Sequence, residues 1–120
     1  EYLYDRPAPL SAATGIDALN YFFSLPEPPT AILCSNDLIA QGVHFRAAQM
    51  NISVPRNLSI IGFDGIPLGS AAIPLTTIKQ DIPAIAKTLF ELCLHPPKEP
   101  RVTILPTEFI PGQTCGWCSR

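Results

Sequence analysis

Apolar residues follow two patterns along the chain, short uninterrupted runs and longer stretches with helical spacing. Short runs between prolines and polar residues are typical of strands buried in a parallel sheet. Apolar positions three or four residues apart are typical of helices that cover such a sheet. The pattern predicts strands over 30–34, 58–63, 75–79 and 102–110, and helices over 11–25, 37–50 and 82–94.

Residues suited to helix capping stand before each predicted helix. Ser11, Asn36 and Asp81 have side-chain oxygens that can accept a hydrogen bond from a backbone N–H of the first turn. Pro83 is tolerated in the first turn of its helix, where the N–H has no helical partner, and Pro26 ends the first helix. The alternation of helices and strands predicts an α/β domain with a mainly parallel sheet flanked by helices. Its crossover connections are expected to be right-handed.

Polar side chains stand at the ends of three predicted strands, as Asn36, Asp64 and Gln80. In open α/β sheets, ligands bind beyond the carboxyl ends of the strands. One carboxylate and two amides there form a hydrogen-bonding set suited to a polyhydroxylated or amide-rich small molecule. Simpler roles stay open, because Asn36 is a good helix cap and Asp64 before Gly65 is typical of a turn.

Composition narrows the range of functions. The chain has 120 residues, 47% hydrophobic and 15% charged, which is typical of a globular domain that needs no metal or disulfide. Its net charge is −2 and its basic residues are scattered, so no surface for a nucleic-acid backbone is expected. Residues 1–9 do not have the pattern of a signal peptide, and no apolar run is long enough to span a membrane. We expect no catalytic residue, cofactor or metal. A phosphoacceptor role for Asp64 would require a second acidic pair, which is missing.

The cysteines indicate a reducing compartment without excluding a disulfide. Cys34 and Cys93 fall in a predicted core strand and core helix, where a free cysteine behaves as a small hydrophobe. Cys115 and Cys118 form a CxxC sequence close to residue 120, without the following helix of a redox motif or two further zinc ligands. They are interpreted as incidental residues of a tail. His44, in mid-helix, is interpreted as a surface or interface residue.

Four sequence markers carry a family resemblance over residues 29–81. In order they are PTAI, SNDLIAQG, VPRNLSIIGFD and PLTTIKQ, and weaker similarity continues to LPTE at Leu105–Glu108. Together they resemble the lactose-repressor/galactose-repressor (LacI/GalR) family of bacterial transcription regulators. The resemblance implies a fold like that of type I periplasmic binding proteins, with two α/β lobes around a ligand cleft. It also implies that Asn36, Asp64 and Gln80 contact the effector.

Two departures from the family pattern stand out. Gly65 follows Asp64 where a second acidic residue is common, and residues 111–113 replace an arginine-containing element. The resemblance further implies that residues 1–80 form the second lobe, 81–97 a helix of the first lobe, and 98–120 a return strand and tail. The DNA-binding domain is then expected upstream of Glu1.

The sequence therefore predicts the effector-sensing and dimerising part of a cytoplasmic DNA-binding regulator, and not an enzyme. Its partners would be a sugar or related metabolite, a second copy, and an operator reached only through the upstream domain. The alternative is a periplasmic sugar-binding protein of a transport system, which has a related fold. PLTTIKQ and the apolar helix over 37–50 favour the regulator.

Two predicted helices, 37–50 and 82–94, have apolar surfaces that are expected to pack against another part of the protein or another copy. Helix 37–50 is apolar nearly all round, so its outer side and loop 66–73 are expected to meet a second copy through a two-fold contact. The candidate interface residues are Leu38, Ile39, Val43, Ile66, Leu68 and Ile73. The apolar face of helix 82–94 is expected to pack on this chain's own sheet or on a neighbouring copy, because exposing it is costly. The chain alone, with half a cleft, is expected to bind effector poorly.

Overall fold

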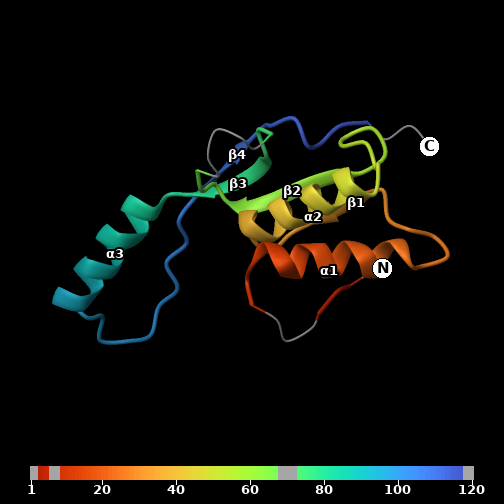
Figure 1. Cartoon of the computed structure of the whole chain (residues 1–120). Coiled ribbons are helices and arrows are strands. Elements are labelled where there is room, and N and C mark those ends of the chain that lie inside the picture. Colours follow the sequence, from red (N-terminus) through yellow and green to blue (C-terminus); the bar gives the residue numbers. More distant parts are fainter. Residues whose placement is uncertain (1–2, 6–8, 68–72, 118–120) are drawn as a thin grey trace.

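Four strands form one sheet, two helices pack together beside it, and a third helix stands apart (Figure 1). The computed structural model describes residues 3–5, 9–67 and 73–117. In chain order the elements are α1 (Ala12–Phe23), β1 (Ala31–Leu33), α2 (Asp37–Gln49), β2 (Ser59–Asp64), β3 (Thr76–Gln80), α3 (Ile82–Leu94) and β4 (Thr107–Ile110).

The sheet is mainly parallel, as the alternating pattern predicts. Its strand order is β1-β2-β3-β4, with β1, β2 and β3 parallel and β4 antiparallel to β3. In the register, Ile61 of β2 lies opposite both Leu33 of β1 and Thr76 of β3. Because β2 is the inner parallel strand, its backbone groups are satisfied from both sides, and its residues Ser59 and Ile60 are buried.

The core lies between α1, α2 and strands β1 and β2. Leu19, Val43, Leu58 and Ile60 are its largest fully buried apolar side chains. The two helices approach closely, since a Cβ at Gly15 would lie 2.1 Å from the backbone oxygen of Ile39. Glycine in α1 therefore permits a helix crossing that any side chain would prevent.

The segment after β4 is part of the fold and not a free tail. Buried Thr114 donates from Oγ1 to the carbonyl of Ile60 at 2.7 Å and accepts from the N–H of Thr76 at 2.9 Å. Its own carbonyl accepts from the N–H of Ile60 at 2.7 Å. One residue thus ties the beginnings of β2 and β3 together. Residues 111–117 are therefore attached to the sheet, and the interpretation of Cys115 and Cys118 as incidental residues stays a prediction.

Several predicted element limits are confirmed and others change. Asn36 and Asp81 cap their helices through side-chain bonds to the N–H groups of Ile39 and Ala84. Ser11 occupies the N-cap position of α1 but makes no side-chain cap bond. The last strand is confined to β4, so the strand predicted over 102–110 is too long. Within residues 101–110, Thr107–Ile110 pair with β3, and residues 101–106 have no partner strand.

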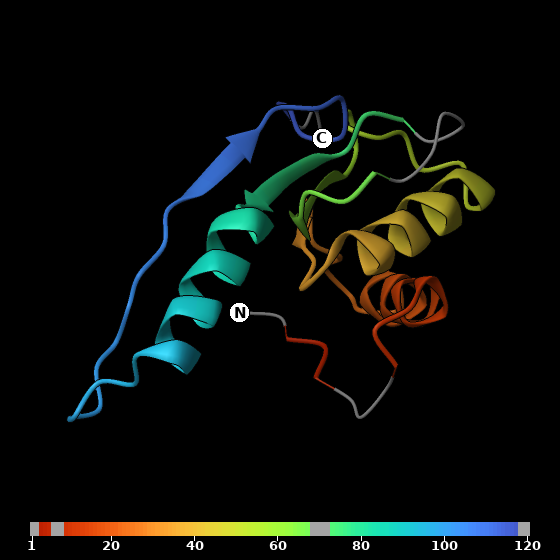
Figure 2. The same cartoon turned by 90° about the vertical axis from the view of Figure 1, so that its left-hand side faces the viewer.

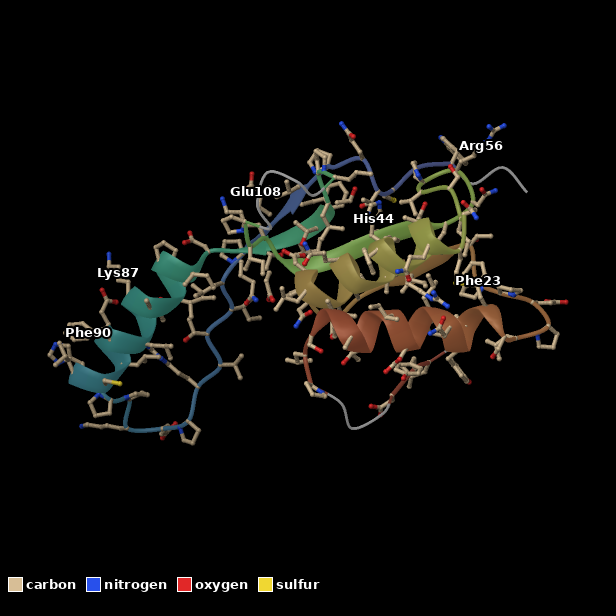
Figure 3. All side chains as sticks on the ribbon, viewed as in Figure 1. Phe23, His44, Arg56, Lys87, Phe90 and Glu108 are labelled. Carbon is tan, nitrogen blue, oxygen red and sulfur yellow. The ribbon has the colours of Figure 1, made fainter. Side chains whose placement is uncertain are left out.

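Helix α3 projects from the end of β3 and has no buried residue (Figure 2). Ile82 and Leu89 are 57% and 58% exposed, and Cys93 is exposed. The expectation that Cys93 lies in a core helix is wrong. Of the two packing partners expected for this helix, the chain's own sheet is excluded, and packing on a neighbouring copy stays a prediction. The helix continues in the direction of β3 beyond the sheet, so no strand lies beneath it. Figure 3 shows Lys87 and Phe90 on this projecting part.

Helices in the described residues are too short for a bilayer. The longest have 13 residues, and in this part of the chain none is long and apolar enough to cross a membrane.

Replacement of Gly42 by alanine tests the helix crossing. A Cβ at this position would lie 1.9 Å from the backbone oxygen of Ala12. We expect Gly42→Ala to lower the free energy of unfolding by about 1–3 kcal/mol, the usual cost of overpacking, in urea denaturation. Without the clash, alanine would stabilise a helix interior by about 1 kcal/mol.

The control for Gly42→Ala is Ala48→Gly on the exposed side of the same helix. It should cost about 1 kcal/mol through helix propensity alone. A stabilising Gly42→Ala would contradict the close approach of α1 and α2.

Candidate functional site

The carboxyl ends of β1, β2 and β3 meet at one edge of the sheet because the three strands are parallel (Figure 1). Asp64 is the last residue of β2 and Gln80 the last residue of β3. Asn36 follows the end of β1 and precedes α2. The structure therefore places the three predicted ligand residues at the same edge, at or after the ends of three neighbouring strands.

Asp64 and Gln80 are in direct contact. The Nε2 amide of Gln80 donates to Oδ1 of Asp64 at 2.7 Å, and both side chains are half-buried. Asp64 has a φ of 108° and Gly65 one of 71°, so the chain turns sharply at the end of β2. A positive φ is costly for a residue with a Cβ and tends to occur at functional sites. The bond to Gln80 engages only one of the two carboxylate oxygens, each of which can accept more than one donor.

Asn36 has a structural role that its sequence position predicts. It is 8% exposed, and its Oδ1 accepts from the N–H of Ile39 at 2.8 Å. The cap orients the side-chain amide, whose NH2 group is a separate donor. Capping and ligand binding are therefore compatible in one residue, because they use different atoms.

Two hollows lie near this edge, of about 470 and 450 Å3, and neither Asn36 nor Asp64 lines them. Gln80 lines one, together with Asp81 and Glu108. We call this edge of the sheet, with Asn36, Asp64 and Gln80, the rim.

A buried acid, Asp37, lies next to this rim; the sequence places it with Asn36 after the end of a predicted strand but does not assign it to the ligand. Asp37 is 1% exposed and accepts hydrogen bonds from Oγ1 of Thr77 at 2.6 Å and from the N–H of Ile66 at 2.8 Å. The sequence feature that could have singled out Asp37 is its position directly after the capping asparagine. Its burial depends on β2 and β3, which are distant in sequence.

The predicted dimer residues divide into two groups. Ile39 and Val43 are buried in the chain's own core, so their assignment to an interface with another copy is wrong. Leu38, Ile66 and Ile73 are 40–41% exposed. Leu68 lies outside the described residues. Phe45, which the sequence analysis did not select, is 55% exposed on α2.

The remaining chemically active side chains do not form a site. Among the described residues, no group of three His, Cys, Asp or Glu could hold a metal ion. His44 is half-buried on α2 (Figure 3), and burial lowers its pKa. Cys115 is an exposed free thiol, and Cys118 lies outside the described residues.

Comparisons with known proteins agree with this fold. Residues 2–115 match the family of periplasmic binding protein-like domains. The HTH-type transcriptional repressor CytR of Escherichia coli (strain K12) is 45% identical over 67 residues, which are 55% of this chain and 20% of that repressor.

Solved structures give the same result. A putative LacI transcriptional regulator from Bacillus cereus subsp. cytotoxis has a TM-score of 0.78 and 30% identity, covering 88% of this chain and 39% of that one. A LacI-family regulator from Enterococcus faecium, solved with bound ribose, has a TM-score of 0.72 and 28% identity, covering 91% and 42%.

The chain belongs to the periplasmic binding protein-like domain family, and it is similar to the corresponding part of LacI-family transcription regulators. It spans about a fifth of the length of the curated repressor and about two fifths of the solved chains. The named relatives are transcription regulators and not enzymes.

Thiol labelling tests the core around β1. Cys34 is buried, and burial, with a smaller contribution from the charge of Asp37, raises the pKa of its thiol to about 12. At pH 8 the thiolate fraction is therefore about one in ten thousand. We expect iodoacetamide to modify Cys93 and Cys115, which are exposed, and to leave Cys34 intact until urea unfolds the chain. Peptide mass mapping checks this, and rapid labelling of Cys34 in the folded chain would contradict it.

Proposed function

We propose that this chain binds a sugar-like effector at the carboxyl edge of its sheet, through Asn36, Asp64 and Gln80. The observation that carries the proposal is the hydrogen-bonded pair of Asp64 and Gln80 at the ends of adjacent parallel strands. A LacI-family regulator of similar structure was solved with ribose, which supports a polyhydroxylated ligand.

The chemistry of the three side chains suits hydroxyl groups. A carboxylate accepts from hydroxyls, and the two amides both donate and accept, so each hydroxyl can find a complementary atom. The bond from Gln80 orients Asp64 before a ligand arrives, which lowers the cost of ordering on binding. Hydrogen bonds to a charged group contribute about 1.5–3 kcal/mol each, so Asp64 is the strongest single contact we expect.

The proposed whole protein is a cytoplasmic, DNA-binding transcription regulator. In this proposal residues 1–80 belong to one lobe, 81–97 to a helix of the other, and 98–120 to the return strand and tail. The exposed apolar face of α3 and its distance from the sheet support that division. Effector binding would favour one arrangement of the lobes and so change operator binding through a separate DNA-binding domain.

Replacing Asp64 by asparagine tests the ligand site. We propose titrating the 15N-labelled chain with D-ribose and D-glucose at millimolar concentrations, because the chain alone is expected to bind weakly. The signals of Asn36, Asp64 and Gln80, including the two side-chain amide groups, should shift with at least one sugar. Asp64→Asn should weaken that response by about tenfold or more, since it removes the charge from the hydrogen bonds.

The matched control is Asp17→Asn on the exposed surface of α1, which makes the same chemical change away from the rim. It should leave the sugar response unchanged. An absence of shifts at all three rim residues, or equal effects of the two substitutions, would overturn the proposed ligand site.

We also propose that α2 and the residues beside it form a two-fold contact with a second copy. The supporting observation is a group of exposed apolar side chains on α2 and on both flanks of loop 66–73. Its members, named the α2 face, are Leu38, Phe45, Ile66 and Ile73. A self-complementary contact of this kind is the common solution for a soluble homodimer.

Sedimentation velocity tests the α2 face. Phe45→Glu puts a charge on the α2 face, and we expect it to raise the dimer dissociation constant by at least about 30-fold, equivalent to 2 kcal/mol. Phe90→Glu on α3, where the side chain is 66% exposed, is the matched control and should leave association unchanged. A monomer at high concentration, or dissociation by Phe90→Glu alone, would contradict the proposal.

A further inference from the structure

The carboxylate of Asp37 is the centre of a buried hydrogen-bonded cluster next to the rim. Asp37 is 1% exposed and Thr77 is 6% exposed, and the hydroxyl of Thr77 donates to Oδ1 of Asp37 at 2.6 Å. The other oxygen, Oδ2, accepts from the backbone N–H of Ile66 at 2.8 Å. Each carboxylate oxygen thus has a specific donor, as a buried charge requires.

These bonds act on the turn that carries Asp64. Asp64 and Gly65 have positive φ values, and Ile66 is the next residue along the chain. The turn is held on one side by the bond from Gln80 to Asp64 and on the other by the bond from Ile66 to Asp37. Gln80 and Thr77 both belong to β3, so the two attachments tie one turn to one strand. A costly backbone conformation persists only where its surroundings hold it in this way.

The carboxylate of Asp37 also packs at a defined position against the sheet. A Cβ at Gly62 would lie 2.2 Å from Oδ1 of Asp37, so only a glycine at this point of β2 leaves room for the acid. Asp37 is the first residue of α2, where the partial positive charge of the helix N-terminus favours a carboxylate. Geometry and electrostatics therefore hold the group in one position.

We propose that Asp37 is a positioning residue for effector recognition, which acts by fixing the turn 64–66 and hence the direction of the Asp64 carboxylate. It does not touch the ligand. The inference rests on the proposed role of Asp64 in sugar binding for its functional consequence, whereas the anchoring of the turn can be measured without a ligand. The two residues at the start of α2 would then have different roles. Asn36 would contact the ligand, and Asp37 would hold the turn 64–66.

Amide hydrogen exchange at Ile66 measures the anchor directly. We expect Asp37→Ala and Thr77→Val each to raise the exchange rate of this N–H by about tenfold or more in the ligand-free chain. Asp37→Asn should restore most of the protection. Its carbonyl oxygen can accept from Ile66 while its NH2 group donates to the Thr77 hydroxyl. Thr77→Ser, which keeps the hydroxyl, should behave like the unmodified chain.

The matched control is Thr76→Val, at the neighbouring buried threonine of β3. Its hydroxyl accepts from the N–H of Gly112 and not from the turn. Thr76→Val should lower the free energy of unfolding while leaving exchange at Ile66 unchanged. Should Thr77→Val and Thr76→Val alter Ile66 equally, Asp37 would be a general stabilising residue and the inference would be overturned. The threonine variants decide this even if Asp37→Ala does not fold.

The sugar titration supplies the functional measurement. Asp37→Ala and Thr77→Val should weaken the response to D-ribose or D-glucose by about tenfold, with rescue by Asp37→Asn and Thr77→Ser. A normal response in variants whose Ile66 exchanges rapidly would overturn the positioning role. Failure of Asp64→Asn to alter the response would instead overturn the proposed ligand site. The two failures are distinguishable because different variants report them.

Discussion

The parallel pairing of β2 with both neighbours is the constraint on which the rest of the structure depends. Parallel strands present their carboxyl ends at one edge, so the residues that end β1, β2 and β3 are brought together whatever their separation in sequence. Parallel strands also need crossover connections, which α2 supplies between β1 and β2. The chain thereby places a helix start beside the strand ends, where Asn36 caps α2.

Buried polar groups hold the two ends of the β2–β3 pair. Thr114 bonds to Ile60 and Thr76 at the beginning of the strands, and Asp37 links Thr77 of β3 to Ile66, which follows the carboxyl end of β2. Among the described residues, no buried side-chain polar atom lacks a hydrogen-bond partner. A fully satisfied network of this kind specifies one register, because a shift of the strands would leave buried groups unpaired.

Some parts of the chain are well buried and others are largely exposed. The core between α1, α2 and the first strands is closed, whereas α3 and residues 101–106 leave large apolar side chains exposed, with Val102 at 88% and Ile104 at 87%. Structural relatives are more than twice as long as this chain, since it corresponds to 39% and 42% of two of them. Helix α3 and residues 101–106 diverge from the sheet together, which supports the proposed division into two lobes.

Sequence alone determined the order and type of the elements, since these depend on local patterns and caps. Asn36 and Asp81 cap their helices, and the apolar runs form the strands within one or two residues for all but the last strand. The strand-end positions of Asp64 and Gln80 followed from the same reasoning. Only the tertiary structure decided which side of α2 is buried, because apolar residues occur on several sides of that helix. It also revealed the roles of Asp37 and Thr114, whose partners lie 29–54 residues away, and the exposure of α3, which depends on which neighbours are present and not on the helix's own amphipathic pattern.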